Sequence, residues 1–267
     1  MIVSGVDVGS LSAKALILNE GKIKGWGLVL TGPDSVESAD RAMDLAMKEA
    51  NISLEQINYT VATGYGRINV PFAQTTVTEI SCHARGNHWF FPQVRTILDM
   101  GGQDCKAIRC DEDGRLTNFA MNDKCAAGTG RYLERVAMTL GMSLGEIGPL
   151  SLAWVEGPLP ISSTCAVFAE GDIVGLLREG KNPNDILAGA TDAIVDRVVA
   201  LLERVGVEED LCVSGGVAKN IGVVKRLEKK LGVKAYIAPE PQIVGALGAA
   251  LFAMAKMREG NETKSAR

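Results

Sequence analysis

The sequence predicts an α/β protein of two lobes, each built on a β-meander with helices behind it. Three observations support this fold class: a repeat of strand-like segments, glycine turns directly after strands, and helical periodicity behind each meander. The chain has 267 residues, of which 46% are hydrophobic and 22% charged, so it can bury a sizeable core without staples. We expect an ordered globular protein with a frayed polar tail after Arg258.

The repeat lies in the segments that begin each lobe. Residues 2–8 and 94–100 are β-rich runs in which Asp7 and Asp99 precede a glycine turn. In both copies a glycine follows the aspartate at +2 and a lysine at +7, with a constant offset of 92. Each run continues into a second strand, a polar glycine turn and a third strand. The sequence therefore predicts a duplicated three-stranded meander.

Helices are predicted behind both meanders, over Ser35 to Ala50 and over Gly130 to Leu140. A longer helix is predicted from about Asn184 to Val205, between an Asn-Pro start and Gly206. The elements expected after it are a strand at Asp210 to Ser214, a helix to Leu231, a strand at Val233 to Ala238 and a final helix from about Val244. We expect residues 1–91 plus about 244–267 to form the N-terminal lobe and residues 92–243 the C-terminal lobe.

Charge and hydropathy exclude two classes of partner. With 28 basic and 32 acidic residues the net charge is −4, which gives no basic field to attract a nucleic acid or a membrane. The chain opens on a strand-like segment without a basic flank or cleavage site, and no apolar run reaches the roughly 20 residues that span a bilayer. We expect a cytoplasmic protein.

Three glycine loops follow predicted strands. A glycine there lets the backbone approach a phosphate, and its exposed N–H groups bind phosphate oxygens. The loops are Asp7-Val-Gly-Ser-Leu-Ser-Ala-Lys, Asp99-Met-Gly-Gly-Gln-Asp and Ser214-Gly-Gly-Val-Ala-Lys-Asn. One such loop is weak evidence, because ordinary strand-ending turns look alike. Because two of the loops are related by the repeat, we favour a nucleotide-binding site over ordinary turns.

Two aspartates on facing loops suit a triphosphate with Mg²⁺. Magnesium keeps most of its water and takes few carboxylates, so Asp7 and Asp99 are candidates to hold it through water. There is no Gly-x-x-x-x-Gly-Lys-Ser/Thr motif, which excludes a P-loop, and Gly128-Thr-Gly130 does not continue as a dinucleotide fingerprint.

Residues 2–18, 94–108 and 212–220 resemble the superfamily of actin, sugar kinases and chaperone ATPases, which has the ribonuclease-H-like fold. The resemblance implies an ATP cleft between the lobes and a helix before the second phosphate loop that orients the attacking water. Glu79 lies where that helix should be, and Gln103 and Asp104 compete for its role. Alternatively, Glu79 and His83 form a solvated pair on one helix face.

Six cysteines are scattered without a Cys-x-x-Cys pair: Cys82, Cys105, Cys110, Cys125, Cys165 and Cys212. Cys125 and Cys165 lie where a polar stretch gives way to a predicted helix, whose N–H groups and dipole favour a thiolate. A [4Fe–4S] cluster needs four cysteines, which two chains of a symmetric dimer would supply. A lone cysteine is more often a small core residue.

Six segments closely resemble the ATP-dependent activators of 2-hydroxyacyl-CoA dehydratases, which belong with the benzoyl-CoA reductase ATPase subunits. They are Ala62-Thr-Gly-Tyr-Gly-Arg67, Glu79-Ile-Ser-Cys-His-Ala-Arg85, Asp99-Met-Gly-Gly-Gln-Asp104, Asn122-Asp-Lys-Cys-Ala-Ala-Gly-Thr-Gly-Arg131, Ile161-Ser-Ser-Thr-Cys165 and Ser214-Gly-Gly-Val-Ala218. The resemblance covers nearly the whole chain, and the two cysteine segments are absent from plain kinases.

The resemblance implies an oxygen-sensitive homodimer of anaerobic metabolism that holds one [4Fe–4S] cluster through Cys125 and Cys165 of each chain. ATP use would drive a low-potential electron from a ferredoxin or flavodoxin to an iron–sulfur dehydratase or reductase. The other four cysteines would be packing residues. The residues expected to contact ATP or ADP are Asp7, Gly9, Ser10, Ser12, Lys14, Asp99, Gly101, Gly102, Gln103, Gly128, Gly130, Gly215, Gly216, Asn220 and Gln242. Lys14 and Lys106 would neutralise phosphate charge or else point to solvent.

Three classes of function remain open. The first is the ATP-driven electron donor, acting on a 2-hydroxyacyl-CoA dehydratase or on a benzoyl-CoA-reductase-type or double-cubane-cluster partner. The second is a small-molecule kinase of the same fold, which would survive loss of either cluster cysteine. The third is an ATP-switched scaffold without iron. Iron content separates the first class from the other two.

Overall fold

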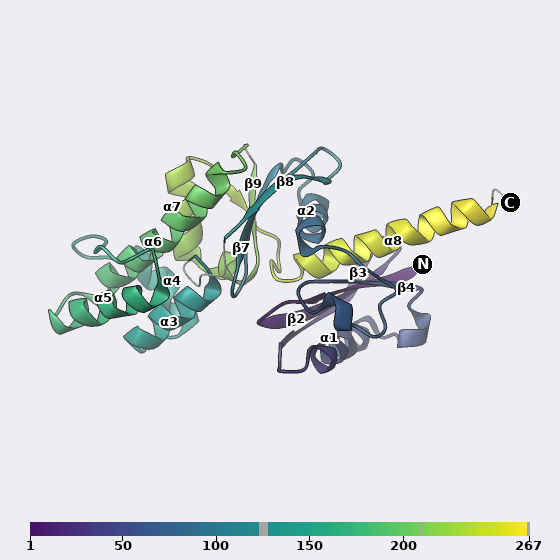
Figure 1. Cartoon of the computed structure of the whole chain (residues 1–267), viewed down its shortest axis with the longest axis horizontal. Helices are drawn as coiled ribbons and strands as arrows, with labels where there is room; N and C mark the ends of the chain where they lie inside the picture. The colour runs from purple at the N-terminus through teal and green to yellow at the C-terminus, as the bar shows by residue number, and fades with distance from the viewer. Residues whose placement is uncertain (123–127, 209, 266–267) are drawn as a thin grey trace. The chain divides into compact units, whose positions relative to one another are not determined.

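The computed structural model describes residues 1–122, 128–208 and 210–265, the last five as backbone only (Figure 1). The chain divides into two compact units. The first comprises Met1–Pro92, Asp111–Leu116 and Gln242–Arg267, and the second comprises Gln93–Cys110 and Thr117–Pro241. Each unit is built on a five-stranded sheet.

The first unit has strand order β3-β2-β1-β4-β5. Its strands are β1 (Ile2–Val8), β2 (Ser12–Asn19), β3 (Lys22–Leu30), β4 (Tyr59–Thr63) and β5 (Thr75–Thr76). Its helices are α1 (Ser35–Ala50), α2 (Glu79–Phe90) and α8 (Val244–Ser265), with short 3-10 turns η1 (Leu54–Gln56) and η2 (Arg67–Asn69).

The second unit has strand order β10-β9-β6-β7-β8. Its strands are β6 (Thr96–Met100), β7 (Cys105–Cys110), β8 (Leu116–Met121), β9 (Leu211–Ser214) and β10 (Ala235–Tyr236). Its helices are α3 (Gly130–Leu140), α4 (Leu144–Leu152), α5 (Ala166–Arg178), α6 (Pro183–Glu203) and α7 (Ile221–Leu231), with the 3-10 turn η3 (Gly216–Lys219).

The two sheets have the same topology, so the predicted duplication of the meander is confirmed. In each sheet three antiparallel strands are followed by two parallel ones, β4 and β5 in the first and β9 and β10 in the second. The constant spacing of seven residues between aspartate and lysine matches the register of the two hairpins. It places Asp7 directly opposite Lys14 across the first hairpin, and Asp99 directly opposite Lys106 across the second.

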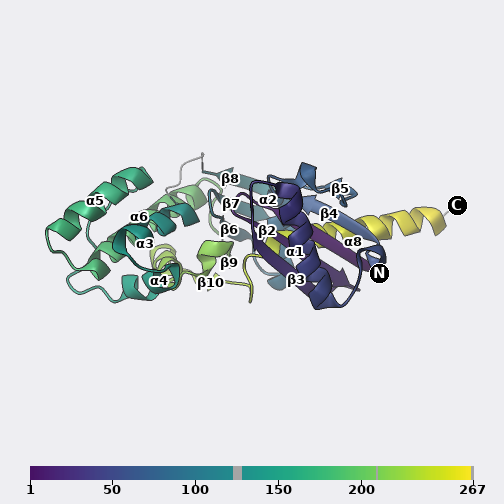
Figure 2. The ribbon, with the colours of Figure 1, turned by 90° about the horizontal axis from the view of Figure 1, so that it is seen from below.

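Successive side chains of β1 and β2 point to opposite sides of the first sheet, and both sides are apolar. Val3 packs with α8 residues, whereas Val6 and Val8 pack with α1 residues. Figure 2 shows α1 covering one face of β1–β3, with α8 on the other side. Asp7 follows the odd-numbered positions of β1, so its side chain lies on the α8 face.

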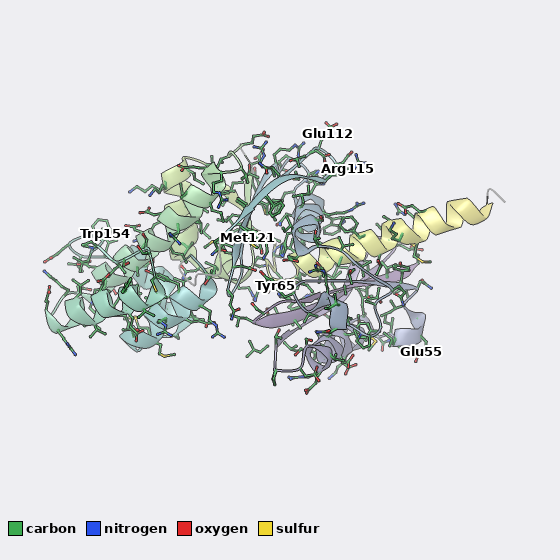
Figure 3. The ribbon with its side chains drawn as sticks, viewed as in Figure 1. Glu55, Tyr65, Glu112, Arg115, Met121 and Trp154 are labelled. Carbon is green, nitrogen blue, oxygen red and sulfur yellow. The ribbon has the colours of Figure 1, made fainter. Side chains whose placement is uncertain are left out.

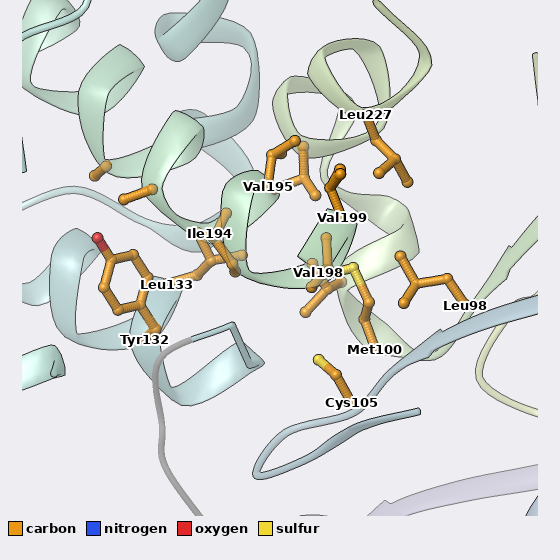
Figure 4. Packing of buried hydrophobic residues seen from close by; sticks show 14 of the residues in the cluster. Leu98, Met100, Cys105, Tyr132, Leu133, Ile194, Val195, Val198, Val199 and Leu227 are labelled. Atoms are coloured by element: carbon orange, nitrogen blue, oxygen red, sulfur yellow. The ribbon is translucent and has the colours of Figure 1, made fainter. Parts of the chain in front are cut away.

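One apolar cluster holds the second unit together. Leu98 and Met100 of β6 and Cys105 of β7 project from the sheet towards α6, whose Val198 lies in the same cluster (Figure 4). Tyr132 and Leu133 of α3 complete the neighbourhood. The first turn of α3 is thereby held beside the ends of β6 and β7.

Glycines allow α8 to pack closely against its neighbours. A Cβ at Gly5 of β1 would lie 2.0 Å from the Ala246 carbonyl oxygen, and one at Gly248 would lie 1.8 Å from the Cys82 carbonyl oxygen of α2. Neither position can carry a side chain unless the backbone shifts. The N-terminal half of α8 can therefore pack this closely in the first unit only because these two positions are glycine.

Helices α1 and α3 have the predicted bounds, but two expectations near the C-terminus are wrong. The strand expected over Val233 to Ala238 is only Ala235–Tyr236, the fifth strand at the sheet edge. The tail expected to fray after Arg258 continues α8 to Ser265. That tail contains no proline, and Lys256 pairs with Glu259 across one turn at 3.3 Å. None of the helices described is both long and apolar enough to cross a membrane.

The close approach at Gly248 yields a stability prediction. We expect Gly248→Ala to lower the free energy of unfolding by about 2–3 kcal/mol, because the new methyl group meets the Cys82 carbonyl. Gly260→Ala on the same helix is the matched control, since a Cβ there meets nothing within 4 Å. Urea denaturation measures both, and equal midpoints for Gly248→Ala and wild type would contradict the packing argument.

Candidate functional site

In the first unit the candidate site is the turn between β1 and β2. The turn is closed by a hydrogen bond from Gly9 N to Ser12 O of 3.0 Å. Lys14 Nζ lies 3.2 Å from Asp7 Oδ2, and the two side chains are only 13% and 7% exposed. The lysine therefore turns inward to the aspartate, which excludes the alternative that it points to solvent.

Two glycines and a histidine surround the Asp7 carboxylate. A Cβ at Gly64 would lie 2.6 Å from Asp7 Oδ1, and one at Gly245 would lie 2.8 Å from Asp7 Oδ2. The Cβ at Gly245 would also lie 3.1 Å from Nε2 of His83, a buried residue of α2. Sequence reasoning assigned no role to these two glycines, because the contacts join β1 to segments far along the chain.

In the second unit the equivalent turn joins β6 to β7. Gly101 N donates to Asp104 O at 2.9 Å, just as Gly9 does to Ser12. Lys106 is 4% exposed, with Nζ 2.8 Å from Asp104 Oδ1 and 3.9 Å from Asp99 Oδ2. This lysine also points inward, and it serves two carboxylates.

The start of α3 is bonded to this turn. Gly130 N donates to Gly101 O and Arg131 N to Gly102 O, both at 2.9 Å. A Cβ at Gly130 would lie 3.2 Å from the Gly102 Cα, so glycine permits the contact. Gly101, Gly102 and Gly130 are thus neighbours beyond the end of β6, and a Cβ at Gly215, directly after β9, would lie 2.3 Å from the Met100 carbonyl oxygen.

The duplication extends further than the sequence indicated. Thr63 ends β4 opposite Asp7, and Ser214 ends β9 opposite Asp99. Each is followed by a glycine of positive φ, Gly64 at +85° and Gly215 at +83°. In the sequence, a Ser or Thr followed by Gly at the end of each of these strands could have revealed this part of the duplication.

The two hydroxyls differ in what they bind. Ser214 Oγ donates to Asp99 Oδ1 at 2.9 Å. Thr63 Oγ1 is buried, and within the described residues it makes no hydrogen bond of normal geometry; its polar neighbour is the Cys82 thiol, a weak partner at best. The serine therefore stabilises its carboxylate directly, and the threonine does not.

Other predicted residues have separate surroundings. Ser10, Gln103 and Gly216 are exposed, and Gln242 is half-buried just before α8. Gly128 is buried with a φ of +93°. Asn220 caps α7 by accepting from Val223 N at 3.1 Å.

Glu79, the first residue of α2, has Arg67 as its ion-pair partner, at 3.5 Å. Arg67 also donates to the Gly64 carbonyl oxygen at 2.9 Å, which connects Glu79 to the turn beside Asp7. Tyr65 of that turn is 57% exposed (Figure 3). The predicted solvated Glu79–His83 pair does not describe this site, since His83 is buried.

Cys165 is the N-cap residue of α5 and is half-buried. Its side chain makes no capping hydrogen bond, so the thiol is not committed to its own helix. Cys125 lies outside the described residues. Cys82, Cys105, Cys110 and Cys212 are buried, as predicted for packing residues. Burial raises the pKa of the Cys82 thiol to about 12, and it also raises the pKa values of Cys105 and Cys212.

Comparison with known proteins gives the family. A family model described as the BadF/BadG/BcrA/BcrD ATPase family matches residues 4–253. The chain belongs to this ATPase family. The resemblance predicted from the cysteine segments is therefore confirmed, and the protein is an ATP-binding ATPase.

Two relatives in the BadF/BadG/BcrA/BcrD family match nearly end to end. An activator of lactoyl-CoA dehydratase from Anaerotignum propionicum is 46% identical, over 95% of this chain and 97% of the relative. The solved activator of the 2-hydroxyisocaproyl-CoA dehydratase from Clostridium difficile, with bound ADPNP, is 38% identical, covers 98% of both chains and has a TM-score of 0.92. A glucokinase from Streptomyces griseus, 14% identical over 96% of this chain and 100% of its own with a TM-score of 0.61, shows the fold alone. The predicted actin and sugar-kinase fold class is confirmed.

The internal duplication supplies a matched pair of variants. We expect Ser214→Ala to lower the free energy of unfolding by about 1–3 kcal/mol, because it leaves the buried Asp99 carboxylate without one of its donors. Thr63→Val, at the equivalent position, should change stability by less than about 0.5 kcal/mol, because within the part of the chain described the Thr63 hydroxyl makes no hydrogen bond of normal geometry. Thermal unfolding of both variants tests this, and a larger loss in Thr63→Val would refute it.

Proposed function

We propose that this protein is an ATP-hydrolysing iron–sulfur electron donor that activates a partner 2-hydroxyacyl-CoA dehydratase by low-potential one-electron transfer. The observation that carries the proposal is the full-length match to two proteins named as activators of such dehydratases. The position of Cys165 at a helix N-terminus supports it further.

Of the two cysteines expected to bind the cluster, Cys165 lies in the described part of the chain, and its surroundings fit an iron–sulfur cluster. Cys165 presents a half-buried thiol beside the N–H groups that begin α5, and such groups stabilise a thiolate. Burial raises the pKa values of the Cys82, Cys105 and Cys212 thiols, which suits packing rather than ligation. On this proposal Cys125 and Cys165 of two chains bind one [4Fe–4S] cluster, which supplies one-electron chemistry when bound.

The aspartates and lysines at the two β-turns fit binding of a magnesium triphosphate. Asp7 and Asp99 would hold Mg²⁺ through water, and Lys14 and Lys106 would offset phosphate charge. The attacking water forms a bond to the γ-phosphorus while the bond to the bridging oxygen breaks, and ADP and phosphate leave. Glu79 would orient that water from the start of α2. Asp104 is held by Lys106, so we assign it to positioning the lysine.

Electron transfer completes the proposed cycle. A ferredoxin or flavodoxin supplies one electron, and one electron leaves for the docked partner. ATP binding would alter the surroundings of the cluster in both chains together, and hydrolysis would reset the dimer. The potential of a cluster depends on hydrogen bonds to sulfur and on solvent exposure, which are quantities that protein motion can change.

Iron content tests the proposal directly. Protein purified without oxygen should contain about two irons and two acid-labile sulfides per chain, and a mass measurement should show a dimer. Cys125→Ala and Cys165→Ala should each remove the iron. Cys212→Ala, at a buried thiol, is the control and should retain it. Absence of iron from the anaerobic wild type would reject the electron-donor proposal.

ATPase kinetics test the assignment of Glu79. Glu79→Gln should lower kcat by about 100-fold while leaving ADPNP affinity within about twofold of wild type, because the carboxylate acts on water and not on the phosphates. Gln103→Ala is the competing variant, at an exposed position of the second turn. If Gln103→Ala loses kcat and Glu79→Gln does not, the assignment moves to Gln103.

A further inference from the structure

Arg67 belongs to a turn that packs against the end of β1. In this turn Gly66 N donates to the Val8 carbonyl oxygen at 2.9 Å. A Cβ at Gly64 would lie 2.6 Å from Asp7 Oδ1, so the turn also approaches the Asp7 carboxylate closely. The backbone that carries Arg67 is therefore attached to the strand that carries Asp7.

One guanidinium nitrogen of Arg67 joins this turn to α2. Arg67 Nη1 donates to the Gly64 carbonyl oxygen at 2.9 Å, and it lies 3.5 Å from Oε2 of Glu79, the first residue of α2. The Glu79 side chain is 14% exposed and the Arg67 side chain 33%, so water screens this pair less than it screens a fully exposed one. The carboxylate that we assign to the attacking water is thus bonded to the turn beside Asp7.

The charges of Asp7, Glu79 and Arg67 act on one buried thiol. Burial is the main reason that the pKa of the Cys82 thiol rises to about 12. The negative charges of Asp7 and Glu79 add to this rise, and the positive charge of Arg67 opposes it. Two carboxylates this near to the same thiol also repel each other, which favours an orientation of Glu79 away from Asp7 unless a cation lies beside it. Arg67 supplies that cation.

The internal duplication shows that the turn itself does not require an arginine. Arg67 N donates to the Gly64 carbonyl oxygen at 3.3 Å, and in the second unit Ala218 N donates to the Gly215 carbonyl oxygen at the same distance. Arg67 and Ala218 each stand four positions after the threonine or serine that ends a parallel strand. The same backbone hydrogen bond therefore forms with a methyl group in one unit and a guanidinium in the other, so the Arg67 side chain is not needed to close the turn.

We propose that Arg67 is a positioning residue, which holds the Glu79 carboxylate beside the Asp7 turn in the orientation that directs the attacking water. This inference rests on the proposed function, in which Glu79 acts on that water. A guanidinium suits this task, because it stays charged and its planar donors fix the direction of a carboxylate. The turn is hydrogen-bonded to β1, so Arg67 relates the position of Glu79 to the strand that carries Asp7.

ATPase kinetics and nucleotide binding test this role. Arg67→Ala should lower kcat by about tenfold or more, because a displaced carboxylate orients water poorly. The affinity for ADPNP with Mg²⁺, measured by calorimetry, should stay within about twofold of wild type, since on this proposal Arg67 acts on Glu79 and not on the phosphates. Arg67→Lys keeps the positive charge and a donor nitrogen, so it should retain kcat within about threefold of wild type.

The matched control is Arg115→Ala. Arg115 pairs with Asp113 at 3.0 Å in an exposed segment of the same unit, and its loss should leave kcat within about twofold of wild type. Arg67→Ala should fold, because the second unit forms the equivalent turn with alanine, and its urea midpoint checks this. If that midpoint falls, Arg67→Met, which keeps an unbranched side chain without donors, replaces it with the same expected loss of kcat.

A double variant separates positioning of Glu79 from direct action on phosphate. If Arg67 acts through Glu79, then adding Arg67→Ala to Glu79→Gln should lower kcat by less than about twofold further. If instead the double variant loses the product of the two single effects, Arg67 acts independently of Glu79 and the inference is overturned. A wild-type kcat in Arg67→Ala would overturn it as well.

The two proposals fail in different measurements. Iron-free wild type would reject the electron-donor function, while ATP hydrolysis by the variants would still decide the role of Arg67. A wild-type dimer that holds iron, together with an undiminished kcat in Arg67→Ala, would reject the role of Arg67 and leave the electron-donor function standing.

Discussion

In both units a carboxylate at the end of the first strand lies opposite a lysine of the second strand, and the surrounding chain is arranged to bury this pair. A charged side chain that is removed from water needs a partner of opposite charge. The register of each hairpin supplies this partner, because it places the lysine directly opposite the aspartate. Burial also requires the neighbouring backbone to come close. Gly64 and Gly245 allow this around Asp7, and Gly215 allows it around Asp99. The strand-ending glycines and the ion pairs are therefore two parts of one constraint.

The two copies of this arrangement differ in charge. Asp7 and Lys14 neutralise each other, whereas Lys106 faces both Asp99 and Asp104, so these three side chains together carry one negative charge in excess. On the proposed function this asymmetry has a consequence. A divalent cation would be attracted to the excess negative charge at the second turn, so magnesium should accompany the nucleotide as it binds.

The sequence was sufficient for features that depend on local pattern. Helix α1 follows from its periodicity, and the paired hairpins follow from two short segments with the same spacing of aspartate, glycine and lysine. The length of strand β10 was overestimated, because nothing in the sequence distinguishes its two paired residues from the rest of the apolar run. The hydrogen bond from Cys105 N to Asn122 was not predictable, since the two residues are 17 positions apart. Likewise, nothing local indicates that Gly245 contacts Asp7.

Helix α8 has one end against the Asp7 carboxylate and the other at the C-terminal end of the described chain. At a rise of about 1.5 Å per residue, its length from Gly245 to Ser265 separates the two ends by about 30 Å. Residues from Arg258 to Gly260 are already exposed. An affinity tag or a spectroscopic label fused after the helix would therefore stand well clear of the carboxylate.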